Sequence, residues 1–182
     1  MEELLSIVKP ILTTDSKLQS NNIERETINV AYLICFYGVA KNAISSLKAI
    51  LFKRYSTEVV NALIDECIKK KTTYDKNIVY FGGHQSRLGH YFRHLFQTVS
   101  FVDRAKFLTN EQKYQYVKLL RAQLTTYEQA LFFFNSLSLL GEKWEKNEWV
   151  SKYKMIKNLP QDFIEQINPK SHYNKFLYEW EE

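Results

Sequence analysis

Three of the four histidines lie within eleven residues, and two arginines are interleaved with them. The segment contains His84, Arg87, His90, Arg93 and His94. On a helix, Arg87 and His94 lie two turns apart on one face, and His90 and Arg93 are neighbours away from the apolar side. Histidine takes up or releases a proton near neutral pH, and arginine binds a phosphate group through two parallel hydrogen bonds. These side chains suit cleavage of RNA without a metal ion.

Two pairs in this segment are candidates for the reaction, and spacing leaves the choice open. In either Arg87–His94 or His90–Arg93, the imidazole moves the proton of a ribose 2′-hydroxyl or of the leaving oxygen, and the guanidinium holds the charge on the phosphate. A solvated or partner-facing basic surface is the alternative. The Arg-x6-His spacing of Arg87 and His94 is similar to that of the HEPN ribonucleases. That resemblance implies a helical bundle that joins two such helices across a homodimer.

A second polar line follows further along the chain, where Arg121, Glu128 and Asn135 lie seven residues apart at the edge of an apolar stripe. Polar groups at such an edge need partners, and on a helix Arg121 and Glu128 are too far apart to pair directly. We expect the histidine and arginine segment to supply the partners, with Glu128 orienting an imidazole. Arg121, Gln123, Asn135 and His84 would support the site. The alternative is a buried polar network that fixes helix register.

The elements that must position these residues are predicted to be helices. Proline is restricted to positions 10, 160 and 169, and the chain has only 5 glycines; long stretches without these breakers favour helices. Capping-box patterns at Asn21/Glu24 and Thr109/Gln112 indicate two helix starts. The sequence therefore predicts an all-α, single-domain bundle of five to six helices, HEPN-like by analogy. The expected helices cover residues 21–53, 57–71, 84–105, 109–140, 147–157 and 160–167.

Three regions are expected along the chain. Residues 1–20 are an N-terminal lead-in, and residues 21–141 are the helical core with the motifs. Residues 142–182 are aromatic and charged helices that pack on the core or on a second subunit. The net charge is +4 over residues 41–76 and again over residues 77–141. Such a central basic surface could meet phosphates or an acidic partner.

Composition excludes several classes of protein. The 182 residues fit one domain, and 45% hydrophobic with 25% charged residues excludes a disordered chain;. Cys35 and Cys67 lack metal-ligand spacing, so we expect core cysteines in a reducing cytoplasm, and no metal or other cofactor. Glu2 and Glu3 argue against a secretory leader, and the apolar run at 28–40 is too short to span a membrane;. Motifs of ATPases, α/β-hydrolases and zinc proteases are absent.

Two further segments carry paired motifs. They are Leu-Gly-His-Tyr-Phe-Arg-His-Leu-Phe at 88–96 and Leu-Leu-Arg-Ala-Gln-Leu-Thr-Thr-Tyr-Glu-Gln-Ala-Leu-Phe-Phe-Phe-Asn at 119–135. Together with Ala31-Tyr32 to Gly38, they resemble the phage abortive infection family, the AbiC-like proteins. The resemblance covers about residues 25–141 and implies bacterial antiphage defence. The family pattern falls on Gly89, His90, Tyr91, Phe92, Arg93, Arg121, Ala122, Gln123, Leu124, Glu128 and Asn135.

These observations predict a cytoplasmic antiphage protein with a polar site between the third and fourth expected helices. Its activity would be metal-independent RNA cleavage, with His90 or His94 as acid or base and Arg87 or Arg93 as phosphate clamp. The alternative is a non-catalytic module that senses a phage component or docks onto a partner protein of the same defence system. Expected partners are RNA or a phage component and a second copy of the chain, without a membrane span.

Overall fold

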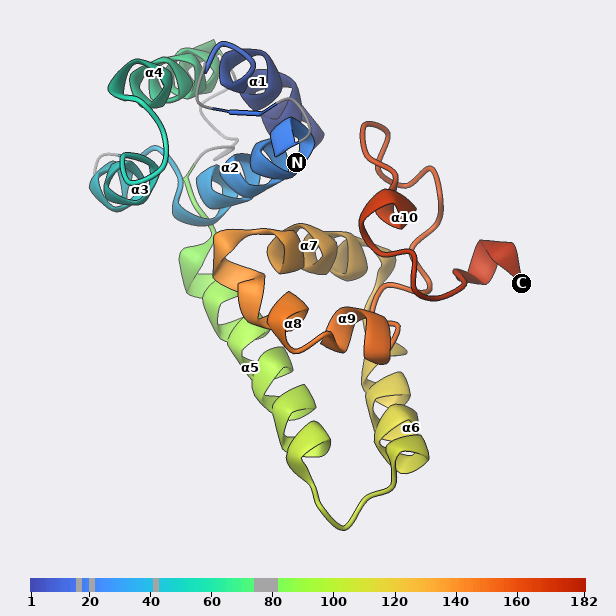
Figure 1. Cartoon of the computed structure of the whole chain (residues 1–182). Helices are drawn as coiled ribbons and strands as arrows, with labels where there is room; N and C mark the ends of the chain where they lie inside the picture. The colour runs from blue at the N-terminus through green and yellow to red at the C-terminus, as the bar shows by residue number, and fades with distance from the viewer. Residues whose placement is uncertain (16–17, 20–21, 41–42, 74–81) are drawn as a thin grey trace. The chain divides into compact units, whose positions relative to one another are not determined.

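The computed structural model describes residues 1–15, 18–19, 22–40, 43–73 and 82–182. Over these residues the secondary structure is wholly helical, with ten α-helices, two short 3-10 helices and no β-strand (Figure 1). The all-α prediction is therefore confirmed. The expected number of five to six helices is too low, because two of the expected helices are each divided in two and several short helices were not anticipated.

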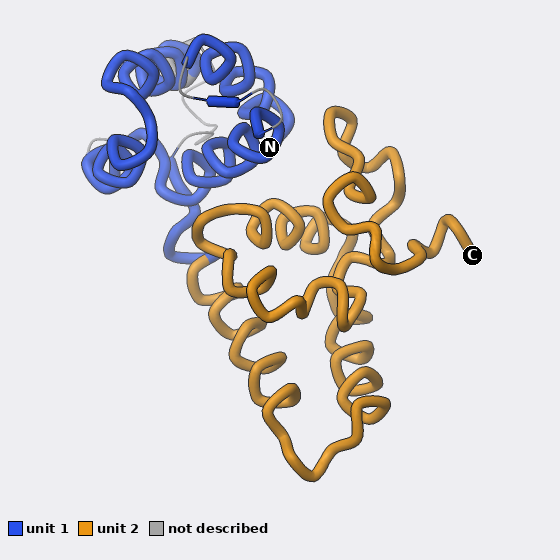
Figure 2. Tube along the Cα trace, in the orientation of Figure 1, with its two compact units in different colours: residues 1–88 blue, residues 89–182 orange. Residues whose placement is uncertain are grey.

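The chain folds into two compact units, residues 1–88 and residues 89–182 (Figure 2). In the first unit, α1 packs against both α2 and α4, and α2 packs against α3. These helices bury apolar stripes, such as Leu5, Val8 and Leu12 of α1, whose spacing of three or four residues keeps them on one side of the helix;. The helices of this unit are α1 (Glu2–Leu12), α2 (Ile23–Tyr37), α3 (Ile44–Leu51) and α4 (Thr57–Thr73).

The expected helix over residues 21–53 is interrupted at Gly38. α2 ends there because Gly38 has a φ of 77°, in the left-handed region that glycine adopts easily at a helix end;. The chain resumes as α3 a few residues later. Asn21 lies outside the described residues, so its capping box with Glu24 stays a prediction. α1 lies within residues 1–20, where no helix was expected.

The second unit begins within α5 (Gln85–Arg104). α7 packs against α8, and α8 packs against α9. α5 reaches α8 and α9 through Phe96, whose ring centre lies 5.2 Å from that of Trp144 and 5.0 Å from that of Trp149. The helices that follow α5 are α6 (Asn110–Arg121), α7 (Thr126–Leu137), η2 (Leu139–Gly141), α8 (Glu142–Lys146), α9 (Trp149–Lys152), α10 (Pro169–His172) and η3 (Glu179–Glu181).

The expected helix over residues 109–140 is also two helices. α6 begins with the predicted capping box, in which the Thr109 side chain accepts from the Gln112 amide at 3.2 Å and the Gln112 side chain accepts from the Thr109 amide at 2.9 Å;. A second capping box, formed by Thr125 and Glu128, begins α7. Because a capping box requires a non-helical residue at its start, this motif separates α7 from α6.

Residues 142–182 consist of short helices joined by turns. Within residues 147–157 the helix is only α9, and residues 160–167 form turns and bends in place of the expected helix. The segment is nevertheless held to α7 of its own unit. The Tyr173 hydroxyl donates to Oγ of Ser136 at 3.0 Å, and both side chains are buried.

Candidate functional site

The polar residues of interest form an exposed surface on α5. We call it the outer face of α5. Each member lies three or four residues from another member, the spacing that keeps side chains on one side of a helix. On the opposite side, Phe92, Leu95 and Val99 are buried, and the Phe92 ring contacts Phe132 of α7. Burial of that side determines which residues meet solvent, and the outer face consists of His90, Arg93, His94, Gln97, Phe101 and Arg104.

The outer face of α5 carries positive charge and no carboxylate. Among the described residues, neither Arg93 nor Arg104 forms an ion pair. The acidic residue of α5, Asp103, is used elsewhere: its Oδ1 accepts from Nζ of Lys152 at 2.6 Å and from the Tyr153 hydroxyl at 2.5 Å. A surface of this kind attracts anions.

Asp103 fastens the C-terminal end of α5 to its neighbours. Partial burial raises the pKa of this carboxyl, but the hydrogen bonds from Lys152 and Tyr153 outweigh that effect, so the pKa lies below its ordinary value;. The Asp103 carbonyl also accepts from Nζ of Lys113 on α6 at 2.7 Å. The end of α5 is therefore tied to both α6 and α9.

Glu128 is brought to α5, but its partners are not the histidines. Its Oε2 accepts from the Thr125 amide and the Thr125 hydroxyl, both at 2.8 Å. The hydrogen bond from the backbone amide lowers the pKa of Glu128. On α5 it is Tyr91 that lies near this carboxylate. Burial and the negative charge of Glu128 together raise the pKa of Tyr91. Glu128 thus takes part in the capping box of α7 and lies near a tyrosine, and its role in orienting an imidazole stays a prediction.

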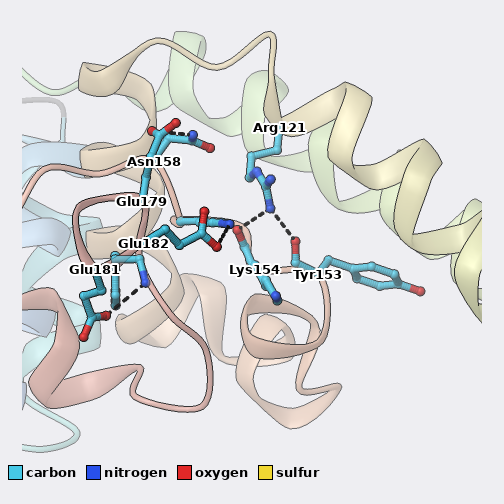
Figure 3. A network of polar contacts seen from close by, with 9 residues as sticks. Arg121, Tyr153, Lys154, Asn158, Glu179, Glu181 and Glu182 are labelled. Atoms are coloured by element: carbon cyan, nitrogen blue, oxygen red, sulfur yellow. Dashed lines mark hydrogen bonds and ion pairs between the residues drawn. The ribbon is translucent and has the colours of Figure 1, made fainter.

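Arg121 is buried, with 4% of its surface exposed, and its guanidinium is directed at backbone carbonyls (Figure 3). Nη1 donates to the carbonyl of Tyr153 at 3.2 Å and to that of Lys154 at 2.9 Å. These carbonyls follow the end of α9, and the Lys154 carbonyl also accepts from the Lys157 amide at 3.0 Å. Lys154 also has a φ of 50°, in the left-handed region, so the guanidinium stabilises an uncommon turn;.

The C-terminal residues surround the same turn (Figure 3). Glu182 pairs with Lys157, and this contact, followed by the charges of Lys154 and Arg121, lowers the pKa of Glu182. Nδ2 of Asn158 donates to Oε2 of Glu179 at 2.7 Å. These contacts hold the C-terminal residues against the segment that follows α9.

The remaining supporting residues of the second unit differ in exposure. Gln123 is exposed in the turn between α6 and α7, whereas Asn135 is 3% exposed. The Asn135 carbonyl accepts from the Ser138 amide at 3.0 Å and hydroxyl at 2.8 Å. A Cβ atom at Gly141 would lie 2.0 Å from that carbonyl oxygen, so the close turn after α7 requires glycine;. Asn135 therefore lies in a packed turn, away from solvent.

His84 and Arg87 belong to the first unit. The His84 amide donates to the Phe36 carbonyl at 2.9 Å and to the Cys35 carbonyl at 3.2 Å, so it serves the C-terminal end of α2;. Arg87 is exposed in the first turn of α5. Because the Arg87–His94 pair spans two units, the structure describes only the His90, Arg93 and His94 group as one exposed cluster.

Sequence reasoning missed the second half of the outer face, namely Gln97, Phe101 and Arg104. The signal was present, because the same three- and four-residue spacing continues from His94 to Arg104;. It also missed the Thr125–Glu128 capping box, which has the same pattern as the one recognised at Thr109.

Within the described residues, no three His, Cys, Asp or Glu side chains are grouped as metal ligands would be. No described helix combines the length and the apolar character needed to cross a membrane. Cys35 and Cys67 are both free thiols, and burial raises the pKa of Cys67 to about 12.

The fold and the site define an all-helical protein whose second unit presents a cationic helix face. Comparison with known families adds that residues 83–164 match the model of the family described as Putative phage abortive infection protein. The resemblance noted from the sequence is thereby confirmed over this range, which includes His90, Arg93, Arg121 and Glu128. No curated protein and no solved structure matches the sequence, so the HEPN-like arrangement stays a prediction.

Proposed function

We propose that this protein acts in antiphage defence by binding RNA on the outer face of α5 and cleaving it there without a metal ion. The observation that carries the proposal is the exposure of His90, Arg93 and His94 in adjacent turns, with no carboxylate on that face. Cationic side chains neutralise the phosphates of a nucleic acid backbone and supply most of the affinity. The family match supports the biological role.

The proposed reaction is attack of a ribose 2′-hydroxyl on the adjacent phosphorus. One of the imidazoles of His90 and His94 takes the hydroxyl proton as the new oxygen–phosphorus bond forms, and the other gives a proton to the 5′-oxygen as its bond to phosphorus breaks. The products are a 2′,3′-cyclic phosphate and a 5′-hydroxyl, so no co-reactant is needed. Arg93 holds the charge that develops on the phosphate oxygens. Arg87 with His94 is the alternative pair.

Incubation of the full-length protein with total RNA and a chelator tests this activity. We expect fragments that end in a cyclic phosphate. His90→Ala/His94→Ala should cleave at least about 100-fold more slowly, because general acid–base catalysis contributes roughly that much. Single Arg93→Ala and Arg87→Ala variants then decide which arginine binds the reacting phosphate.

The matched control is Lys143→Ala/Lys146→Ala, which removes two exposed cations from α8. This variant should cleave at the wild-type rate. RNA that stays intact with wild-type protein in an extract of phage-infected cells would contradict the activity. Cleavage by His90→Ala/His94→Ala as fast as wild type would assign the reaction to other residues.

A second candidate function is favoured by exposed apolar residues on α6. Tyr116 and Leu119 are 53% and 65% exposed, which suits docking onto a second copy of the chain without catalysis;. Light scattering should give twice the mass of one chain for the wild type and the mass of one chain for Tyr116→Asp/Leu119→Asp. A monomeric wild type would contradict this candidate.

A further inference from the structure

A hollow lies at the C-terminal end of the outer face of α5, wholly within the second unit. Its volume is about 310 Å³, at the lower end of the range for ligand pockets;. It is lined by Gln97, Ser100, Phe101, Arg104, Ala105 and Phe107.

Two phenylalanine rings of this hollow are unusually exposed. Phe101 is 74% and Phe107 is 81% exposed, whereas Phe92, Phe132 and Phe133 of the same unit are buried. Burying a ring of this size stabilises a protein by about 1.5–3 kcal/mol. Two exposed rings that line one hollow therefore leave the folded chain less stable than it would be if they were buried. Such a site suits a flat, partly apolar ligand that covers both rings.

The polar residues of the hollow indicate an anionic ligand. Arg104 presents a guanidinium without an ion-pair partner among the described residues, and Gln97 adds an amide with both donors and acceptors;. The carboxylate of Asp103, which is next to Arg104 in the chain, is paired with Lys152. Flat rings, a free cation and an amide together match an unpaired nucleobase with its phosphate.

We propose that the hollow binds an unpaired base of single-stranded RNA by stacking it on Phe101 and Phe107. This inference rests on the proposed function and specifies its substrate. A base inside a duplex is paired and stacked, so it cannot enter the hollow, whereas a single strand can turn a base outward.

The hollow also sets where the strand would be cut. Phe101 lies seven residues after His94, which corresponds to about 10 Å along the helix axis. A stacked strand advances about 3.4 Å per nucleotide, so a base in the hollow places a phosphate roughly three nucleotides away beside His94 and Arg93. The outer face of α5 would thus hold the strand at one end and react with it at the other.

Fluorescence anisotropy with the full-length protein tests the proposal. The probes are a labelled 2′-O-methyl oligouridylate of twelve nucleotides, which lacks the reactive hydroxyl, a chain of the same length without bases, and a duplex of twelve base pairs. We expect the single strand to bind at least about tenfold more tightly than the other two probes, because each stacked base contributes a factor of this size.

The informative variant is Phe101→Ala/Phe107→Ala, which removes two exposed rings. It should bind the single strand at least about tenfold more weakly than wild type and bind the baseless chain equally well. Tyr127→Ala is the control, since Tyr127 is also 74% exposed but lies on α7, and it should bind all probes as wild type does. Circular dichroism should give the same helical content for the three proteins.

The outcomes separate this inference from the proposed function. If Phe101→Ala/Phe107→Ala keeps wild-type affinity, or if wild type binds the duplex or the baseless chain as tightly as the strand, base stacking is refuted while RNA binding stands. If wild type binds none of the probes, both fail. Loss of a bound phage protein in Phe101→Ala/Phe107→Ala, without loss of RNA binding, would identify a protein-docking site and overturn the inference.

Discussion

The arginines of the second unit are used in two different ways. Arg93 and Arg104 lie exposed on the outer face of α5, where a guanidinium can bind an anion. Arg121 is buried and donates to two backbone carbonyls. Burial is what separates the roles, because a buried guanidinium must be satisfied by the protein itself.

We predict that Arg121→Met destabilises the protein by about 3 kcal/mol, because it leaves two carbonyls of the turn after α9 without their charged donor. Urea unfolding followed by tryptophan fluorescence measures this loss. Lys118→Met is the matched control, since it removes an exposed cation from the same helix and should change the free energy of unfolding by less than about 0.5 kcal/mol;. Equal effects of the two substitutions would show that the Arg121 contacts contribute little.

Helices of the second unit depend on contacts at their ends. Thr109 and Thr125 begin α6 and α7 with capping boxes. At the C-terminal end of α5, Asp103 joins this helix to α9 through Lys152 and to the residue after α9, Tyr153. These end contacts hold α5 in the orientation that exposes its outer face.

The contacts of Asp103 make the stability of this unit depend on pH. The folded protein has a lowered Asp103 pKa, so the stabilisation is present above the unfolded value of about 3.9 and is lost as the pH falls through the folded value;. Relative to wild type, Asp103→Asn should lose about 1 kcal/mol at pH 6 and progressively less as the pH falls below about 3.9. Urea unfolding across this range measures the difference. A loss that stays constant with pH would mean that the charge of Asp103 does not matter.

At the scale of the whole molecule, the internal contacts divide the chain between residues 88 and 89. Trp144, Trp149 and Trp180 all lie in the second unit, so tryptophan emission reports that unit alone. The helical signal in circular dichroism reports both units. The two probes therefore distinguish where a substitution acts.

We predict that Leu63→Ala, in the buried face of α4, destabilises the first unit by about 2–5 kcal/mol because it leaves a cavity;. The unfolding transition seen by circular dichroism should shift to lower urea, and the transition seen by tryptophan emission should shift less. Coincident transitions with equal shifts would indicate that the two units unfold as one cooperative structure.

Local patterns in the sequence were sufficient to predict the helical class, the start of α6 at Thr109 and the family resemblance. Helix periodicity, the scarcity of glycine and proline, and capping residues act over a few positions, so they can be read from the chain itself. The same periodicity correctly separates the outer face of α5 from its buried side. The interruption at Gly38 and the second capping box at Thr125 were readable in principle but were not recognised.

Only the tertiary structure decided what the polar residues do. Seven-residue spacing places Arg121, Glu128 and Asn135 on one line of an ideal helix, but the turn between α6 and α7 breaks that line. Their partners then come from distant or unexpected segments, such as the carbonyls of Tyr153 and Lys154 for Arg121. Long-range packing determines which charged groups are buried and which stay in solvent, and sequence spacing alone carries no information about it.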